Sequence, residues 1–348
     1  MKAFYKKHIL NFKLASGTSR GILKTKETYF LKITDKVKVG IGECAVFRGL
    51  SIDDVPNYEE KLNWVCNNIN LDKNILFNEL IEFPSIQFGL EQALLSLKSK
   101  DEFELFPSKF TKSNDEININ GLVWMGTELF MKKQIEEKLK SGFSTIKLKI
   151  GAIDFKTEYN LLKSIRKEFS VKDITLRVDA NGGFKPNEAL DKLKYLSDLE
   201  LHSIEQPIMV NQWEEMANLC IKSPLDIALD EELIGVFHIT EKKRILETIK
   251  PQYIILKPSL IGGIKGSNEW IDLANDRNID WWITSALESN IGLNAIAQYT
   301  YSLGNKTPQG LGTGSLFTNN ISSPLIVQNG NLLYDNNLKW DLNLLNEF

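Results

Sequence analysis

Five ionisable side chains recur at nearly even intervals through the middle of the chain. Each ends a short, mostly aliphatic run and is followed by loop residues; they are Lys149, Asp179, Glu205, Asp230 and Lys257. Their separations of 30, 26, 25 and 27 residues match the length of one strand, one helix and two short loops. Because the carboxyl ends of parallel strands meet at one mouth when such units close into a barrel, we expect the five side chains to converge there.

Three of the five residues are acids, and their convergence indicates a metal site. If Asp179, Glu205 and Asp230 lie close together, they cannot all stay ionised unless a cation lies among them. Oxygen ligands on short, rigid strand ends suit Mg²⁺, with Mn²⁺ as a substitute, and leave positions for water and substrate oxygens. Any one of these acids alone is more simply interpreted as a salt-bridged strand end. Three in register favour a ligand set.

The two lysines gain a chemical role from such a metal. Nearby positive charge lowers the pKa of an ammonium group, so we expect lowered pKa values for Lys149 and Lys257 beside the cation, with Lys147 acting in the same direction. A neutral lysine can remove the proton α to a carboxylate, and a metal can hold the resulting enediolate. Strands two and six lie on opposite sides of an eight-stranded barrel, so the two lysines should face a substrate from opposite sides.

The strand that carries the first lysine shows how these residues are positioned. Residues 144–151 are STIKLKIG, in which the three aliphatic residues share one face and Lys147 and Lys149 share the other. Taken alone, this run is typical of a half-buried surface strand. The four similar runs that follow it favour a barrel strand whose aliphatic face meets a ring of helices. A short eighth strand is expected at residues 308–312.

The rest of the chain is arranged around this α/β barrel. Residues 1–110 show strand-like runs first and helical spacing afterwards, which is typical of an α+β module. Within it, residues 14–23 (LASGTSRGIL) are expected to form a polar loop. Residues 111–316 carry the barrel. Residues 317–348 form a C-terminal tail without a helical repeat, which we expect to pack back on the N-terminal module.

The composition argues against several classes of partner. A net charge of −3 gives no reason to expect nucleic acid or an anionic membrane as a partner. No apolar run approaches the roughly 20 residues of a membrane span, and no signal peptide is evident. Three cysteines without a C-x-x-C pair suit a reducing compartment, so we expect a cytoplasmic protein. The expected partner is the small carboxylate substrate on which the lysines would act. Nothing in the sequence indicates an oligomeric state.

Histidine is scarce, which argues against other catalytic machinery. The chain has three histidines, and none falls at a predicted strand end. His202 is three residues before Glu205, so it should point outward if Glu205 points inward. A histidine base, a zinc triad or a Ser-His-Asp set is therefore not expected at the mouth.

Several sequence blocks resemble the enolase superfamily. The series K-x-K, VDAN, IEQP, LDE and K-P is similar to its muconate-lactonising-enzyme-like subgroup, which has lysines on strands two and six. The blocks INGLVWMG, RVDANGGF, ILKPSLIGG, SALESNIGLNAIAQ and GLGTGSLF resemble more closely the o-succinylbenzoate synthase family of menaquinone biosynthesis. The N-terminal TSRGIL and GIGECAVFRGLS are similar to the substrate-facing loops of that family. The resemblance extends over most of the chain.

The resemblance implies a fold and a reaction. The fold is a modified TIM barrel, (β/α)7β, with an N-terminal α+β capping domain completed by the C-terminal tail. The reaction is the Mg²⁺-dependent syn dehydration of 2-succinyl-6-hydroxy-2,4-cyclohexadiene-1-carboxylate to o-succinylbenzoate, which makes the protein a lyase. Lys149 would remove the α-proton and assist the leaving hydroxyl, and Lys257 would face the enolate as a cation. Asp179, Glu205 and Asp230 would bind Mg²⁺.

The same resemblance implies a set of substrate-binding residues. Lys147 would hold the substrate carboxylate and tune Lys149, and Arg20 is a hypothesis based on an isolated cation in a polar loop. Four residues would form the pocket for the succinyl part: Gly262, Gly263, Ser285 and Gly312. Asn181 and Ser259 complete the expected set.

Three other functions remain open from the sequence. A racemase of N-acylamino acids or an epimerase of dipeptides could use the same two lysines and would exchange solvent deuterium into both enantiomers. A Schiff-base aldolase would use Lys149 or Lys257 covalently, without a metal, and would leave the three acids unexplained. A non-catalytic binding or scaffold barrel would tolerate loss of the acids and lysines, yet all of them are present.

Overall fold

The chain begins with an antiparallel sheet and three helices, which we call the capping domain. The computed structural model describes residues 1–18, 21–124, 126–151 and 153–343. The sheet has the order β1-β2-β3, and its strands and the helices after it are β1 (Lys2–Thr18), β2 (Gly21–Thr34), β3 (Val39–Cys44), α1 (Tyr58–Asn68), α2 (Lys73–Glu79) and α3 (Pro84–Lys98). Helix α3 packs directly on β3. A Cβ atom on Gly42 would lie 2.0 Å from the carbonyl oxygen of Gly89, so glycine is required for this close approach.

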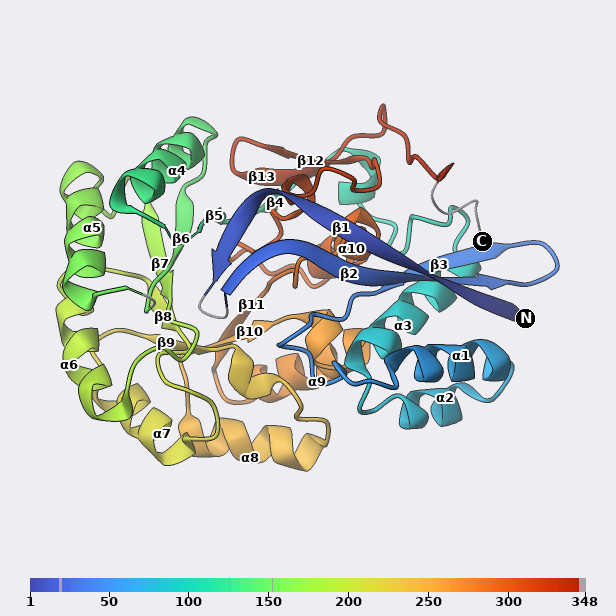
Figure 1. The fold of residues 1–348 in the computed structure, drawn as a ribbon, viewed down its shortest axis with the longest axis horizontal. Coiled ribbons are helices and arrows are strands. Elements are labelled where there is room, and N and C mark those ends of the chain that lie inside the picture. The colour runs from blue at the N-terminus through green and yellow to red at the C-terminus, as the bar shows by residue number, and fades with distance from the viewer. Residues whose placement is uncertain (19–20, 125, 152, 344–348) are drawn as a thin grey trace.

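The hairpin of β1 and β2 is longer than predicted. The polar loop expected at residues 14–23 is wrong, because β1 continues to Thr18 and β2 begins at Gly21, with an irregular register between Asn11 and Ser16. Figure 1 shows the hairpin crossing from the capping domain over the barrel strands.

Seven parallel strands form the barrel, in the order β11-β10-β9-β8-β7-β6-β5. They are β5 (Gly121–Val123), β6 (Thr145–Lys149), β7 (Thr175–Asp179), β8 (Ser203–Glu205), β9 (Ile227–Leu229), β10 (Tyr253–Leu256) and β11 (Asp280–Ile283). The eighth strand predicted at residues 308–312 is reduced to two parallel bridges, Gln309 with Ile119 and Gly310 with Thr284. These bridges join the two edges of the sheet and close the barrel.

Helices follow the strands and cover the outside of the sheet (Figure 1). They are α4 (Glu128–Lys140), α5 (Phe155–Glu168), α6 (Pro186–Ser197), α7 (Trp213–Lys222), α8 (Ile239–Ile249), α9 (Gly263–Asn275) and α10 (Asn290–Ser302). Short 3-10 helices are η1 (Phe110–Lys112), η2 (Glu231–Leu233), η3 (Pro258–Leu260) and η4 (Gly314–Leu316). The aliphatic face of β6 is buried under this ring, as predicted: Ile146 and Leu148 are fully buried in the main core.

The C-terminal segment contacts both parts of the molecule. Phe317 pairs with Phe12 of β1, and the amide of Thr318 donates to the carbonyl of Asn11. Strands β12 (Leu325–Gln328) and β13 (Asn331–Tyr334) instead form a small sheet with β4 (Ile117–Asn118), which precedes the first barrel strand. The domain boundaries at residues 110 and 316 stay predictions. Among the described helices, none combines the length and the apolar character needed to cross a bilayer.

Candidate active site

The strand register aligns the predicted acids and lysines. Lys149 of β6 lies beside Asp179 of β7, and Asp179 lies beside Glu205 of β8. Glu205 is paired in turn with Ala228 of β9, two residues before Asp230. Lys257 follows the last residue of β10. Since neighbouring residues in register point to the same side of a parallel sheet, these side chains share the inner face at the carboxyl ends of the strands.

The lysines and acids form two neighbouring ammonium–carboxylate groups at the mouth, one around Lys147 and one between Lys257 and Asp230. Lys149 Nζ donates to Asp179 Oδ2 at 2.6 Å and to Asn181 Oδ1 at 2.8 Å. Lys147 Nζ donates to Asp179 Oδ2 at 2.8 Å and also to Glu205 Oε2. Lys257 Nζ donates to Asp230 Oδ2. The structure therefore brings together all five residues that the spacing predicted.

Burial and neighbouring charges shift the pKa values of these groups in opposite directions. Burial alone would raise the pKa of Asp179, but the ammonium groups of Lys147 and Lys149 hold it well below its usual range. Burial and the charge of Asp179 raise the pKa of Glu205. Burial lowers the pKa of Lys257, but the carboxylates of Asp230, Glu205 and Glu231 together outweigh it, and the net shift is upward. The predicted downward shift assumed a bound cation, whereas these shifts come from the protein's own charges.

The acids have the chemistry of a hard-cation site. Among the described residues, no three His, Cys, Asp or Glu side chains are already arranged as a metal-binding group; ammonium groups hold the carboxylates instead. However, Glu205 Oε1 is buried and makes no hydrogen bond within the part of the chain that the structure describes. An unsatisfied carboxylate oxygen among buried acids from three adjacent strands fits the oxygen ligands that Mg²⁺ prefers. The ligand set of Asp179, Glu205 and Asp230 stays a prediction with this support.

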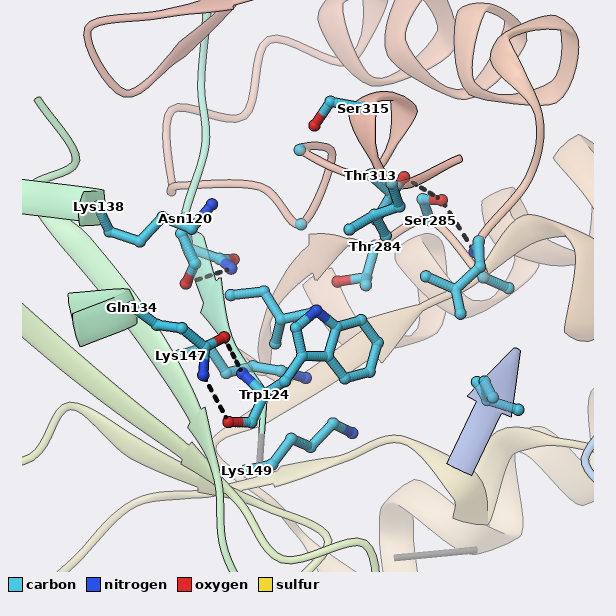
Figure 2. Close-up of a pocket in the computed structure, with 18 of the residues that line it drawn as sticks. Asn120, Trp124, Gln134, Lys138, Lys147, Lys149, Thr284, Ser285, Thr313 and Ser315 are labelled. Atoms are coloured by element: carbon cyan, nitrogen blue, oxygen red, sulfur yellow. Dashed lines mark hydrogen bonds between the residues drawn. The ribbon is translucent and has the colours of Figure 1, made fainter. Parts of the chain in front are cut away.

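A cavity of about 300 Å³ lies above these ammonium–carboxylate groups. Six of the predicted site residues line it: Lys147, Lys149, Asn181, Lys257, Ser285 and Gly312. Figure 2 shows Lys147 and Lys149 on one side and Ser285 with Thr313 on the other. The remainder of the lining is largely apolar and comes partly from the capping domain, through Leu23 and Phe47. The cavity can therefore hold a small carboxylate that has a hydrophobic body.

Three predicted substrate-binding residues are not among those that line the cavity. Ser259 Oγ donates to Glu288, and the carbonyl of Gly262 accepts from Gln87 of α3 at 2.8 Å. A Cβ atom on Gly263 would lie 2.0 Å from the carboxylate of Glu91. These residues join the barrel to the capping domain or to a neighbouring loop. The cavity gives no support to a role for them in a succinyl pocket, and Arg20 lies outside the described residues.

The prediction omitted Trp124, whose indole projects into the cavity (Figure 2). Leu122 lies beside Lys147 in the register, so alternation along the strand directs Trp124 to the same inner face. The side-chain amide of Gln134 accepts from the Trp124 amide at 2.9 Å and donates to its carbonyl at 3.0 Å. These two bonds fix the backbone that carries the indole. The alternation from Leu122 was a signal that could have identified Trp124.

Glu231 is a second residue that the prediction omitted. It directly follows Asp230, is largely buried, and accepts a hydrogen bond from Asn181 Nδ2 at 2.9 Å. Asn181 in turn accepts from Lys149, so Glu231 helps to orient the amide that holds the lysine.

His202 lies at the opposite end of the barrel from the cavity. Its ring centroid is 5.0 Å from that of Tyr253, the first residue of β10, and 6.2 Å from that of Trp282. The expected outward orientation is wrong, because His202 precedes the first residue of β8 and is not bound by the alternation of that strand. Burial lowers its pKa to about 4, which keeps the ring neutral near pH 7.

Comparisons with known proteins identify the family. Residues 131–336 match the model of the enolase C-terminal domain-like family. The chain is 44% identical to an o-succinylbenzoate synthase from Desulfotalea psychrophila, over 95% of this chain and 98% of the relative. The crystal structure of MenC from D. psychrophila superposes with a TM-score of 0.86 at 42% identity and covers 96% of this chain and 99% of that one.

A more distant solved structure shares the fold. It is a dipeptide epimerase from Enterococcus faecalis, complexed with Mg and the dipeptide L-Leu-L-Tyr, which superposes with a TM-score of 0.83 at 18% identity. The match covers 95% of this chain and 96% of the epimerase. A sequence identity of 18% shows only that the two proteins share a fold. The D. psychrophila relative is 44% identical over nearly the whole of both chains, which is enough to show a common family. The chain belongs to the o-succinylbenzoate synthase family, within the group of proteins that carry an enolase C-terminal-like domain.

Proposed function

We propose that this protein is a lyase that dehydrates 2-succinyl-6-hydroxy-2,4-cyclohexadiene-1-carboxylate to o-succinylbenzoate, a step of menaquinone biosynthesis. The observation that carries the proposal is the position of two lysines around three buried carboxylates. Lys149 and Lys257 come from β6 and from the end of β10, and both line the same cavity. Membership of the o-succinylbenzoate synthase family supports the choice of substrate.

Mg²⁺ is the proposed cofactor, held by Asp179, Glu205 and Asp230. When bound, it would polarise the substrate carboxylate and so make the adjacent C–H bond more acidic. A structure of the same fold is complexed with Mg, and the unsatisfied Glu205 Oε1 supports the same assignment. Mn²⁺ is the proposed substitute, because it also prefers carboxylate oxygens.

The lysines divide the proton transfer and the charge stabilisation between them. Lys149 Nζ takes the proton α to the carboxylate, and the electron pair of that C–H bond moves toward the carboxylate. As the ring becomes aromatic, the C–OH bond breaks on the same face and Lys149 returns its proton to the departing hydroxyl as water. Asn181 holds Lys149 Nζ at 2.8 Å in position for both steps. Lys257, whose Nζ donates to Asp230, faces the developing negative charge as an ammonium group.

The remaining cavity wall matches the two parts of the substrate. The indole of Trp124 and the side chain of Leu287 offer apolar surface to the ring. At the side away from Lys149, the hydroxyl of Ser315 (Figure 2) and the backbone of Gly312 offer polar contacts to the succinyl arm. The three cysteines are free, which supports the proposed cytoplasmic location.

The proposal is tested by following loss of the cyclohexadiene chromophore. Purified protein with Mg²⁺ should convert the substrate to o-succinylbenzoate, and EDTA should abolish the conversion until Mg²⁺ is restored. Absence of turnover in protein that still binds Mg²⁺ would exclude the dehydratase.

A second candidate is an epimerase or racemase that uses the same two lysines. The observation that favours it is that Lys149 and Lys257 line one cavity, so each could exchange a proton on one face of a stereocentre. The test is incubation of N-succinylamino acids and dipeptides in deuterated water. Deuterium at the α-carbon of both stereoisomers would support epimerisation, whereas an unlabelled α-carbon would exclude it.

A further inference from the structure

One buried carboxylate connects three segments at the barrel mouth. Glu288 is fully buried; one of its oxygens accepts from Ser259 Oγ and the other from Ser285 Oγ at 2.5 Å. Thr313 Oγ1 donates to Ser285 Oγ at 2.8 Å. Ser259 follows β10, Ser285 follows β11, and Thr313 follows the bridge that closes the barrel. Glu288 therefore holds the segment after Lys257 and the wall opposite Lys149 to each other.

The hydrogen bonds leave Ser285 no freedom to turn. A hydroxyl has one proton and two lone pairs. The proton of Ser285 is donated to Glu288, and its oxygen accepts from Thr313 and from the amide of Leu287 at 3.1 Å. Figure 2 shows Ser285 beside Thr313 on the cavity wall. Ser285 thus shapes the wall, and Thr313 is the hydroxyl that still has a lone pair to offer to a ligand.

The countercharge for this carboxylate comes from the capping domain. Lys26 of β2 is buried, and its Nζ makes no hydrogen bond within the described ranges. Apart from hydrogen bonds, the charges that act on Glu288 are those of Lys26 and of Glu43 on β3. Those that act on Lys26 are Glu43, Glu288, Glu27 and Asp53. Burial raises the pKa of Glu288, and the positive charge of Lys26 opposes that shift. Lys26 and Thr28 alternate onto the same face of β2, and Thr28 donates to Glu43, so Lys26 lies on the face of the strand that meets this cluster.

Glu43 ties the same loop to the capping domain. Its carboxylate accepts from the amide of Ser289 at 2.9 Å and from the amide of Gly292 at 2.8 Å, at the start of α10. Thr28 of β2 donates to it at 2.7 Å. The two glutamates meet at the start of α10, where a Cβ atom on Gly292 would lie 2.8 Å from both Glu288 Cβ and Glu43 Oε2. The charges of both act on Lys26.

We propose that Glu288 is a positioning residue for the substrate cavity, and that Lys26 from the capping domain is the charge that allows it to act. Through Ser259 and Ser285 it sets the distance between the segment that bears Lys257 and the wall formed by Ser285 and Thr313. The capping domain therefore contributes to the shape of the cavity through a buried charge as well as through the residues that line it. The effect on turnover rests on the proposed function; the effect on the mouth segments does not.

Glu91 provides a matched control. It also joins the two domains, with its carboxylate accepting from the amide of Lys265 at 3.1 Å and from that of Ile264 at the start of α9. It is not among the residues that line the cavity. A purely structural carboxylate at this interface should behave like Glu91.

Hydrogen exchange of the full-length protein with Mg²⁺ tests the positioning without any substrate. Glu288→Gln should speed amide exchange in residues 257–262, 285–289 and 310–316, because one of the two hydroxyl donors loses its acceptor. Glu91→Gln should speed exchange only around residues 262–268. Unchanged exchange in the three mouth segments of Glu288→Gln would overturn the proposal.

Steady-state kinetics separate positioning from general stability. We expect Glu288→Gln to raise KM about tenfold and to change kcat by less than about threefold, since the wall is contacted in both the ground and transition states. Glu91→Gln should leave KM unchanged. A wild-type KM in Glu288→Gln would overturn the proposal, even with altered exchange. If the wild type shows no turnover, the proposed function fails, and the exchange result still decides the role of Glu288.

A double variant tests the contribution of Lys26. Lys26→Met should speed exchange in the same three segments, because Glu288 then lacks its cation. Lys26→Met combined with Glu288→Gln should speed exchange by less than the sum of the two single effects, since one of the two carboxylates through which the lysine acts is already neutral. Strictly additive effects on exchange would show that Lys26 acts independently and would overturn its assigned role.

Discussion

Two buried aspartates show how differently the barrel and the capping domain treat charge. Asp179 at the barrel mouth and Asp53 in the capping domain are both fully buried. Asp179 accepts hydrogen bonds from the ammonium groups of Lys147 and Lys149, which hold its pKa well below the usual range. Asp53 accepts from the amide of Ser85 at 2.9 Å and from its hydroxyl at 2.6 Å, and burial raises its pKa to about 6. One site concentrates opposite charges, and the other tolerates a single charge.

The difference follows from the architecture around each group. Each parallel barrel strand delivers one side chain to the same mouth, so acids and lysines accumulate there without an additional loop. Asp53 lies before α1 and bonds to the second residue of α3, where a helix N-terminus offers amide donors and a partial positive charge. These neutral donors bind one carboxylate oxygen, Oδ2, and do not cancel the charge, while Oδ1 is buried without a hydrogen-bond partner among the described residues. We therefore expect the barrel charges to control activity and the capping-domain charge to control stability.

The largest expected effect comes from removing an ammonium group at the barrel mouth. Lys149→Met should lower kcat on the cyclohexadiene carboxylate by about 10³- to 10⁴-fold, the scale of a lost general base. The free energy of unfolding should change much less. Lys133→Met, which alters an exposed lysine of α4, is the matched control and should leave kcat unchanged. A near-normal kcat in Lys149→Met would contradict the expectation that the charged side chains at the barrel mouth control activity.

Removing a carboxylate from the mouth should act through the metal. Glu205→Gln leaves a neutral oxygen where Glu205 Oε1 now has no hydrogen-bond partner among the described residues. We expect Mg²⁺ affinity to fall by roughly 100-fold or more, with kcat/KM restored in part by high Mg²⁺. Isothermal titration with Mg²⁺, followed by turnover at a series of Mg²⁺ concentrations, measures both quantities. Unaltered Mg²⁺ affinity would exclude Glu205 as a ligand.

Ionisation of Asp53 in the capping domain should lower the free energy of unfolding as pH rises. The folded pKa of Asp53 is about 6, above the value of 3.8 for an unperturbed aspartate. The folded state therefore holds the proton more tightly than the unfolded state, so stability is present at low pH and is lost as pH rises from 3.8 through 6. The difference of about two pKa units corresponds to about 3 kcal/mol.

Asp53→Asn should abolish that loss. Its free energy of unfolding in urea, relative to the wild type, should rise by about 3 kcal/mol between pH 3.5 and pH 7. Glu82→Gln, at an exposed position, should show no such trend. A pH-independent difference between Asp53→Asn and the wild type would mean that Asp53 titrates alike in both states.

The charged floor of the cavity was predictable from the sequence, for a physical reason. Strand alternation places Lys147 and Lys149 on one face, and the even spacing of strand ends places Asp179, Glu205 and Asp230 on a common mouth. Both arguments are local and need only the length of a repeating unit. The barrel strands and the position of α5 (Phe155–Glu168) were predictable for the same reason.

The walls of the cavity depend on contacts between distant segments. The polar hairpin around residues 14–23 was interpreted as a loop, yet it remains paired and brings Leu23 to the cavity. Glu288 was noted only as part of a sequence block, because its partners Ser259 and Lys26 are 29 and 262 residues away. No spacing rule links such residues; the packing of the capping domain on the barrel does. Trp124 is the exception, since the alternation from Leu122 could have identified it.

The smallest expected effect weakens the neutral donors around Asp53. Ser85→Ala removes the hydroxyl that donates to Asp53 at 2.6 Å and that contacts the Tyr58 hydroxyl at 2.7 Å. We expect a loss of about 1–2 kcal/mol in the free energy of unfolding, with kcat/KM of the folded enzyme unchanged. Because the hydroxyl stabilises the ionised carboxylate, its loss should raise the pKa of Asp53 further and cost more at pH 7 than at pH 4. Urea unfolding at the two pH values measures this: an equal loss at both would show that the hydroxyl supports packing rather than the charge, and the contrast with Asp179 would then rest on burial alone.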